Sequence, residues 1–132
     1  MVKTAAPPSA LAAGWAPGET RHLQRCLRPT YRLALVAPGQ RCLLWLSGAR
    51  EPGVHAVGVL AGVPGGDGRV EVALHRLEEP LARAELLAEP AFAGAEVVRV
   101  PIGANPSYLT AAQLAPVLAR LEPQARAAAG WV

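Results

Sequence analysis

The chain has few of the side chains on which catalysis and metal binding usually depend. Its 132 residues include one Asp, one Asn, one Lys, three Ser, three His and two Cys. A two-metal phosphoesterase needs clustered Asp and His side chains, which this composition can hardly supply. There is also no run of 18 apolar residues, so the sequence predicts no membrane-spanning helix.

Two cysteines, Cys26 and Cys42, are too few for a disulfide framework. The first residues lack the long apolar stretch of a secretory signal. We therefore expect a cytoplasmic protein with reduced thiols. The length fits one domain, and a domain of this size buries roughly two thirds of the surface of its unfolded chain. We therefore expect it to fold without a metal or a disulfide.

Arginine is abundant and unevenly placed. Ala, Gly, Pro and Arg, all encoded by GC-rich codons, make up 65 of the 132 residues. Residues 20–50 contain six Arg and no acidic residue, whereas residues 51–132 contain six Arg and nine acidic residues. A basic segment favours an anionic partner, nucleic acid first. The alternative is a solvated surface in a chain that uses Arg freely.

The motifs of common enzymes are weak or missing. Cys26 or Cys42 could serve as a nucleophile with His22, His55 or His75 as its base, but Cys42 lies in an apolar run and is better explained as a core residue. A zinc site would have to combine His22, Cys26 and Cys42, without the paired short spacing of such sites. No Gly-x-Ser-x-Gly motif surrounds any serine. We expect no catalytic activity, no metal and no cofactor.

Hydrophobic periodicity predicts a small, mainly β, α+β domain: a curled sheet or barrel with short helices on its rim. Thr110 and Gln113 form a capping box that opens a helix, which contains Pro116 and ends before Pro123. Residues 20–30 are expected to be a loop, and residues 31–36 fit either a short strand or helical turns. The other expected elements are the end of a strand at 2–4, a helical turn at 10–13, strands at 42–47, 54–61, 69–75 and 96–100, and a helix at 82–87.

Two places in the sequence are candidates for ligand binding. Trp45 and Ser47 fall on one face of their predicted strand; Trp45 is either a core residue or the floor of a pocket. Asn105, the only Asn, precedes Pro106, Ser107 and Tyr108 in irregular chain before the capped helix. The segment is explained either as turn chemistry or as a source of hydrogen bonds to a planar ligand that Tyr108 or Trp45 stacks on.

An ordered series of short segments carries a resemblance to a known family. The chain resembles the EVE domain family of the PUA-like superfamily, and is most similar to its short actinobacterial members. The similarity covers most of residues 20–122 and consists of RPTYR at 28–32, APGQ at 37–40, LLWLSG at 43–48, VGV at 57–59, LARAELL at 81–87, EVVRVP at 96–101 and NPSYLT at 105–110.

The resemblance implies one EVE/PUA-like domain over residues 1–122, built as a pseudo-barrel of about five or six strands with flanking helices. The Ala-rich residues 123–132, after the helix has ended, are expected to form a flexible tail. The resemblance also implies a non-catalytic module that binds nucleic acid, DNA more than RNA, and holds a flipped, modified base in an aromatic pocket. Arg25, Arg28 and Arg32 are expected to contact phosphates. The base-binding residues would be Tyr31, Trp45, Ser47, Asn105, Pro106, Ser107 and Tyr108.

The chain departs from the family in two ways. Family members often carry Trp where this chain has Arg25, so the aromatic cage lacks a member unless Trp15 replaces it. The first strand is shorter than in the family, which would leave a sheet edge open to a second copy of the chain. The alternatives to DNA reading are an RNA-binding module of the same fold, or a domain with a degenerate pocket that binds a protein or a small ligand.

Overall fold

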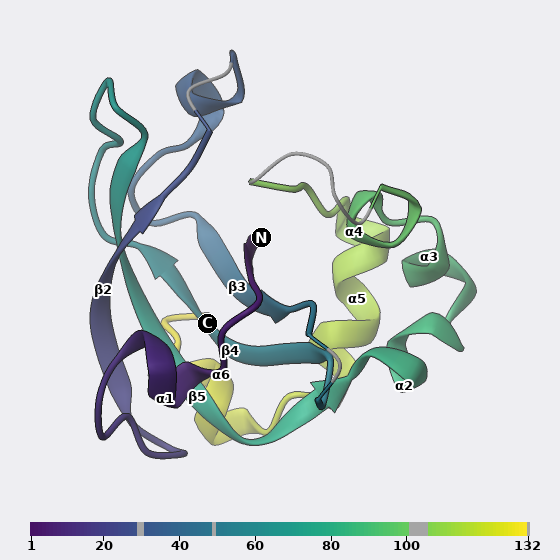
Figure 1. The fold of residues 1–132 in the computed structure, drawn as a ribbon. Coiled ribbons are helices and arrows are strands. Elements are labelled where there is room, and N and C mark those ends of the chain that lie inside the picture. The colour runs from purple at the N-terminus through teal and green to yellow at the C-terminus, as the bar shows by residue number, and fades with distance from the viewer. Residues whose placement is uncertain (29–30, 49, 101–105, 132) are drawn as a thin grey trace.

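The computed structural model describes residues 1–28, 31–48, 50–100 and 106–131. Its centre is a five-stranded mixed sheet with the order β1-β3-β4-β5-β2, which curls into a half-barrel (Figure 1). β1 runs parallel to β3, and the other neighbouring strands are antiparallel. The strands are β1 (Val2–Thr4), β2 (Thr20–Cys26), β3 (Arg41–Leu46), β4 (Gly53–Leu60) and β5 (Arg69–Ala82).

Short helices surround this sheet, so the chain is an α+β protein. Helices α2 to α5 lie together on one side of the sheet (Figure 1). None of the helices within the described ranges is long and apolar enough to cross a membrane. The helices are α1 (Pro8–Leu11), the 3-10 helix η1 (Tyr31–Leu35), α2 (Arg83–Leu87), α3 (Pro90–Ala93), α4 (Glu96–Arg99), α5 (Ala111–Arg120) and α6 (Pro123–Ala128).

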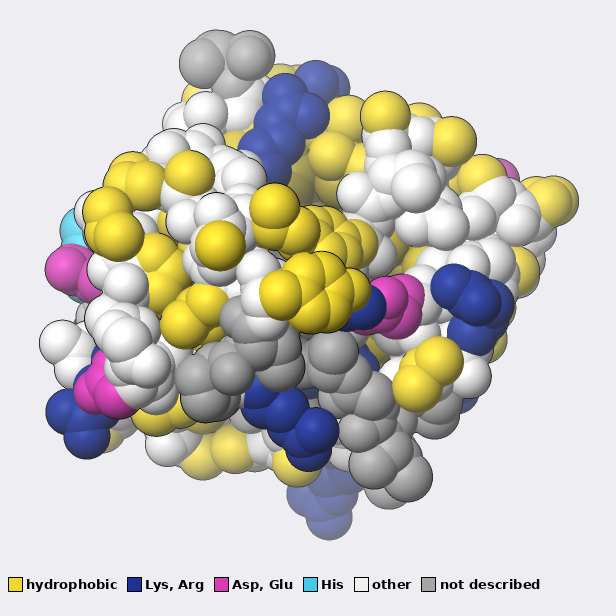
Figure 2. Space-filling model, turned by 90° about the horizontal axis from the view of Figure 1, so that it is seen from above, with side chains coloured by type: hydrophobic (Ala, Val, Ile, Leu, Met, Phe, Trp, Pro, Cys, Tyr) yellow, Lys and Arg dark blue, Asp and Glu magenta, His cyan; other side chains and the backbone are white. Residues whose placement is uncertain are grey.

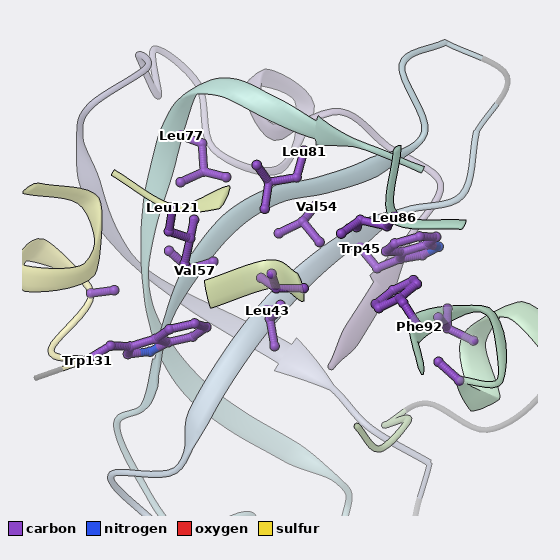
Figure 3. Packing of buried hydrophobic residues seen from close by; sticks show 14 residues of the cluster. Leu43, Trp45, Val54, Val57, Leu77, Leu81, Leu86, Phe92, Leu121 and Trp131 are labelled. Carbon is purple, nitrogen blue, oxygen red and sulfur yellow. The ribbon is translucent and has the colours of Figure 1, made fainter. Parts of the chain in front are cut away.

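Both faces of the sheet are buried, each against its own hydrophobic core. Alternate residues of β3 point to opposite faces, as a strand requires: Leu43 and Trp45 lie in one core and Cys42 and Leu44 in the other. The helix-side core includes Leu86, Phe92, Val97, Val117 and Trp131 from the helices and the C-terminal segment (Figure 3). We call the other the strand-side core; its members are Val2, Trp15, Leu27, Cys42, Leu44, Ala56, Leu60, Val70, Val72 and Leu74.

The apolar runs of the sequence form the central strands as predicted. β3, β4 and β5 confirm the strands expected at 42–47, 54–61 and 69–75, although β5 continues to Ala82. The strand end at 2–4, the helix at 82–87 and the capped helix after Thr110 are also present. Residues 31–35 form a 3-10 helix, one of the two forms that the sequence allows there.

The loop expected at 20–30 is wrong for residues 20–26, which form β2. Its seven residues pair with β5 in an unbroken antiparallel register from Thr20 with His75 to Cys26 with Arg69. The segment contains mostly polar side chains, and only Leu23 packs against the strand-side core. The long neighbouring strand supplies the hydrogen bonds that local composition does not predict.

The strand expected at 96–100 is also wrong, because residues 96–99 form α4. The sequence Glu-Val-Val-Arg-Val has high strand propensity. In the structure Val97 is buried in the helix-side core, and the N–H of Val100 donates to the Glu96 carbonyl at 2.8 Å. Burial of Val97 in the helix-side core therefore accompanies a conformation that differs from the local strand preference.

The C-terminal segment differs from the flexible tail expected at 123–132. Residues 123–128 form α6, and Trp131 is 2% exposed within the helix-side core. The indole N–H of Trp131 donates to the Gly58 carbonyl at 2.7 Å, and Arg41 lies 5.4 Å from its ring. The aromatic anchor, rather than the Ala-rich sequence before it, decides where this segment lies.

The two sheet edges differ. At the start of β1, the Ser107 N–H donates to the Met1 carbonyl at 3.0 Å, and the Met1 nitrogen donates to the Ser107 carbonyl at 2.9 Å. Ser107 thus occupies the outer side of β1 at this point. Among the described residues, β2 has a neighbouring strand on one side only. The dimer predicted through the edge of the short first strand stays a prediction.

Candidate functional site

A cavity of about 340 Å³ lies between the segment around η1 and the segment that leads into α5. Its volume is near the lower end of small-ligand sites. Most of its wall is apolar, and side chains of both cores contribute to it. The lining residues are Met1, Val2, Leu27, Leu35, Val36, Gln40, Arg41, Cys42, Leu43, Leu60, Pro106, Ser107, Tyr108, Leu109 and Leu114.

The segment before α5 supplies the part of this wall that the sequence singled out. Pro106, Ser107 and Tyr108 all line the cavity. Ser107 is 2% exposed and is held by its two backbone hydrogen bonds to Met1. The capping box at Thr110, where the Gln113 N–H donates to the Thr110 hydroxyl at 3.2 Å, fixes the point at which irregular chain becomes helix. Asn105, the other predicted member of this segment, lies outside the described residues.

Arg32 joins three segments beside this cavity. Its guanidinium binds both carboxylate oxygens of Glu96, at 2.9 Å from Nη2 to Oε2, and its Nη1 also donates to the Pro106 carbonyl at 3.2 Å. The hydrogen bond from Arg32 holds the pKa of the Glu96 carboxyl below its usual range. In turn, hydrogen bonding to Glu96 raises the pKa of Arg32. The Arg32 charge, expected to meet phosphate, is therefore neutralised within the chain.

Two exposed tyrosines flank the same guanidinium. The Arg32 Cζ lies 5.3 Å from the centre of the Tyr108 ring and 6.0 Å from that of the Tyr31 ring, within the range of cation–π contacts. Tyr31 is 76% exposed and Tyr108 43%. On the face seen from above, hydrophobic side chains gather near the centre, with Lys and Arg side chains around them (Figure 2). The exposed rings of Tyr31 and Tyr108 offer stacking surfaces to a planar ligand.

The other predicted base-binding residues lie elsewhere. Trp45 is 2% exposed in the helix-side core, where its ring stacks on Phe92 at 5.8 Å between centroids (Figure 3). Ser47 is exposed, and its hydroxyl donates to the Thr4 carbonyl at 3.3 Å. Neither lines the cavity. Trp15, the possible replacement for the missing cage residue, is 1% exposed and belongs to the strand-side core.

The predicted phosphate contacts are not equivalent. Arg28 is exposed and close enough to Lys3 for its charge to lower the pKa of that amine, although burial of Lys3 is the larger cause. Arg25 is partly buried, and its Nε has no hydrogen-bond partner within the described ranges. Arg28 is therefore the predicted phosphate ligand that is best placed to reach an external anion.

Within the described residues, neither candidate thiol nucleophile is hydrogen-bonded to a histidine. Burial raises the pKa of the Cys42 thiol, which disfavours the thiolate. The histidines bond to other groups: His22 to Glu71, His55 to the Glu51 carbonyl and His75 to Thr20. In the part of the chain that the structure describes, no three His, Cys, Asp or Glu side chains come close enough to hold a metal ion.

Sequence reasoning missed Glu96 and most of the apolar wall. Glu96 lies 64 residues from Arg32 and falls in a predicted strand, so no local pattern indicates the pair. Leu35, Val36 and Leu60 are ordinary apolar residues that become lining only through the curl of the sheet. Comparison of the chain with protein-family models, curated proteins and solved structures gives no match.

Proposed function

We propose that this chain is a non-catalytic nucleic-acid-binding module of the EVE/PUA-like type, which reads a modified base in DNA. The observation that carries the proposal is the pair of exposed tyrosines, Tyr31 and Tyr108, beside one guanidinium, with Tyr108 also lining the 340 Å³ cavity. A nucleic-acid partner is compatible with the cytoplasmic location expected from the sequence.

Each part of the arrangement has a role in this proposal. Tyr108 and Tyr31 stack on an extruded base. Pro106 and Ser107, which carry polar groups, line the same cavity as Tyr108. The apolar wall of Leu35, Val36 and other residues accepts a methyl-sized modification. Arg28 contacts the phosphate backbone. Arg32 positions the two rings and does not itself bind phosphate.

The test is a binding titration with matched oligonucleotides, plain and cytosine-methylated, as DNA and as RNA, at about 50 and about 200 mM salt. We expect the methylated DNA to bind most tightly. Tyr108→Ala should weaken its binding by about 1–3 kcal/mol, the usual contribution of one base–aromatic stack. Val63→Ala is the matched control, because Val63 is another exposed apolar side chain, 75% exposed, and it does not line the cavity.

Charge is tested separately. Arg28→Gln should weaken binding to all oligonucleotides about equally and lower the salt slope by about 1, while Arg83→Gln on α2 should leave the slope unchanged. Tightest binding to RNA would favour the RNA-binding alternative. Equal, strongly salt-dependent binding to every oligonucleotide, unaffected by Tyr108→Ala, would leave only an electrostatic surface and overturn base reading.

A second candidate function follows from the lining of the cavity. Leu27, Leu35, Val36, Leu60 and Leu114 make its wall largely apolar. A small apolar ligand would fit such a wall without any nucleic acid. Failure of every oligonucleotide to bind, at either salt concentration, would favour this function.

A further inference from the structure

His55 occupies an unusual position in the central strand of the sheet. On one side, Leu44 and Trp45 of β3 pair with Ala56 and Val54, so that His55 has no partner residue there. The register also shifts at this point on the other side, where β5 pairs through Leu81 and Arg76. His55 is therefore a bulge residue with respect to both neighbouring strands. Bulges redirect side chains and are common beside functional sites.

His55 is 5% exposed, and one of its two ring nitrogens is hydrogen-bonded to the Glu51 carbonyl. Its Nε2 lies 2.6 Å from the Glu51 carbonyl; because a carbonyl only accepts, Nε2 carries the hydrogen. Glu51 itself has a φ of 47°, a left-handed conformation that is uncommon for a residue other than glycine. In the described part of the chain, Nδ1 of His55 has no hydrogen-bond partner. One nitrogen of a largely buried ring is thus left available to a ligand.

His55 lines a cavity of about 810 Å³, and among the described residues none lines both this cavity and the cavity near Tyr108. The residues of β5 between its two pairing registers, 77–80, bulge out of the ladder and form part of the wall. The segment between β1 and α1 forms another part and contributes no titratable side chain. The lining residues are Ala5, Pro7, Pro8, Leu46, Gly48, Arg50, Glu51, His55, Arg76, Leu77, Glu78, Glu79 and Pro80.

The more buried titratable side chains that line this cavity are basic, whereas most of the exposed charged ones are acidic. His55 is buried and Arg76 is partly buried, with its Nη1 held by the Trp15 carbonyl. The exposed charged residues are Arg50, Glu51, Glu78 and Glu79. The inner part therefore offers a guanidinium and an imidazole, and the rim offers mainly carboxylates.

We propose that this cavity binds a small dipolar molecule that carries a carboxylate and a cationic amine. The carboxylate lies at the inner end, against the Arg76 guanidinium, and accepts a hydrogen bond from Nδ1 of His55 after that nitrogen takes up one proton from solvent. The amine lies at the rim, near Glu51, Glu78 and Glu79. Apolar side chains such as Leu46 and Leu77 contact the carbon chain between the two groups.

The test follows the imidazole signals of the full chain by NMR during titration with 6-aminohexanoate. Hexanoate and hexylamine serve as one-ended analogues. We expect a saturable shift of the His55 signal with 6-aminohexanoate and about tenfold weaker binding of hexanoate, which lacks the amine that contacts the carboxylates of the rim. Hexylamine should bind more weakly than either.

Two variants assign the effect to His55. His55→Gln keeps an N–H that can donate to the Glu51 carbonyl but has no second ring nitrogen, and it should weaken binding about tenfold or more. His22→Gln is the control, since His22 is an exposed histidine that is bonded to Glu71 on the sheet surface. Binding that His55→Gln leaves unchanged would overturn the proposal. So would the absence of a saturable shift with 6-aminohexanoate, or tighter binding of hexylamine than of hexanoate.

Discussion

At the scale of single residues, the pairing of Arg32 with Glu96 joins segments of the chain beside the cavity near Tyr108. The guanidinium connects η1, α4 and the segment before α5 by hydrogen bonds to Glu96 and Pro106, and both tyrosine rings lie against it. The Arg32 and Glu96 side chains are 16% and 21% exposed, so water screens the pair less than an ordinary surface ion pair. The guanidinium charge of Arg32 is therefore paired within the chain.

This pair makes the stability of the fold depend on acidity. The hydrogen bond that Arg32 donates to Glu96 places the folded-state pKa of Glu96 below its unfolded-state pKa. The pair therefore contributes its full stability at a pH above the unfolded-state pKa of Glu96. That stability is lost as the pH falls through the folded-state pKa of Glu96. We expect Glu96→Gln to lower the free energy of unfolding by about 1 kcal/mol near neutral pH, with a smaller difference in acid. Urea unfolding at several pH values between about 7 and about 3 measures this.

Glu85→Gln provides the control for that experiment. Glu85 is an exposed carboxylate in the first turn of α2, and it is not paired with Arg32. Its replacement should leave the acid dependence close to that of the parent chain. An unchanged pH dependence in Glu96→Gln would contradict the role assigned to the ion pair.

At the scale of elements, α5 is a helix whose first residue is fixed by a local sequence motif, the capping box. Both hydrogen bonds of the capping box are present: the Gln113 N–H donates to the Thr110 hydroxyl, and the Thr110 N–H donates to the Gln113 side-chain oxygen at 3.0 Å. The predicted start of the helix is therefore confirmed. Its correct placement also matters for the candidate site, because Tyr108 lies just before the cap.

Removal of this cap should cost a measurable part of the stability. Thr110→Ala leaves the Gln113 N–H without its side-chain acceptor and is expected to lower the free energy of unfolding by about 1 kcal/mol. Thr110→Ser retains a hydroxyl at the same place and should cost much less. Urea unfolding of both variants makes the comparison; equal losses would show that the methyl group, rather than the hydroxyl, accounts for the effect.

Other elements depend on their neighbours. α4 contains the strand-like sequence of residues 96–99, and β2 contains a polar segment whose composition predicts a loop. In each case the deciding contact is remote: Val97 is buried in the helix-side core, and β2 pairs along its length with β5. Single-sequence patterns cannot contain this information, because the partner lies outside the local segment that such patterns describe.

At the scale of the whole molecule, the sheet separates two cores, and the C-terminal segment completes one of them. Trp131 packs in the helix-side core, donates a hydrogen bond to Gly58 of β4 and contacts the guanidinium of Arg41 on β3. The last helix is thereby fixed to the centre of the sheet. The domain boundary predicted at residue 122 excludes a residue that the fold buries.

Trp131→Ala should therefore destabilise the entire domain. Loss of a buried aromatic side chain usually costs about 3–5 kcal/mol, and this variant also leaves the Gly58 carbonyl without the indole donor. Gln124→Ala is the control, because Gln124 is exposed on the same C-terminal helix. Thermal and urea unfolding should show a large loss for the first variant and almost none for the second. If both variants lowered the free energy of unfolding by similarly small amounts, residues 123–131 would instead behave as the flexible tail that the sequence predicts.

The sequence by itself determined the central strands and the capped helix. These features depend on local rules: the near-continuous apolar run of β3, the alternation at the start of β5, and the spacing of Thr110 and Gln113. Pro106, Ser107 and Tyr108 stand out because irregular chain before a capped helix is visible locally. The tertiary structure alone decided that they share a cavity wall with residues of β3 and β4.

The tertiary structure also decided which predicted side chains reach solvent. Trp45 and Tyr31 are both aromatic, yet one is 2% exposed in a core and the other is 76% exposed. Arg32 and Arg28 belong to the same basic segment, yet Glu96 neutralises the first while the second is exposed. Exposure and charge pairing are properties of contacts between distant segments, and those contacts exist only after the sheet has curled and the helices have packed against it.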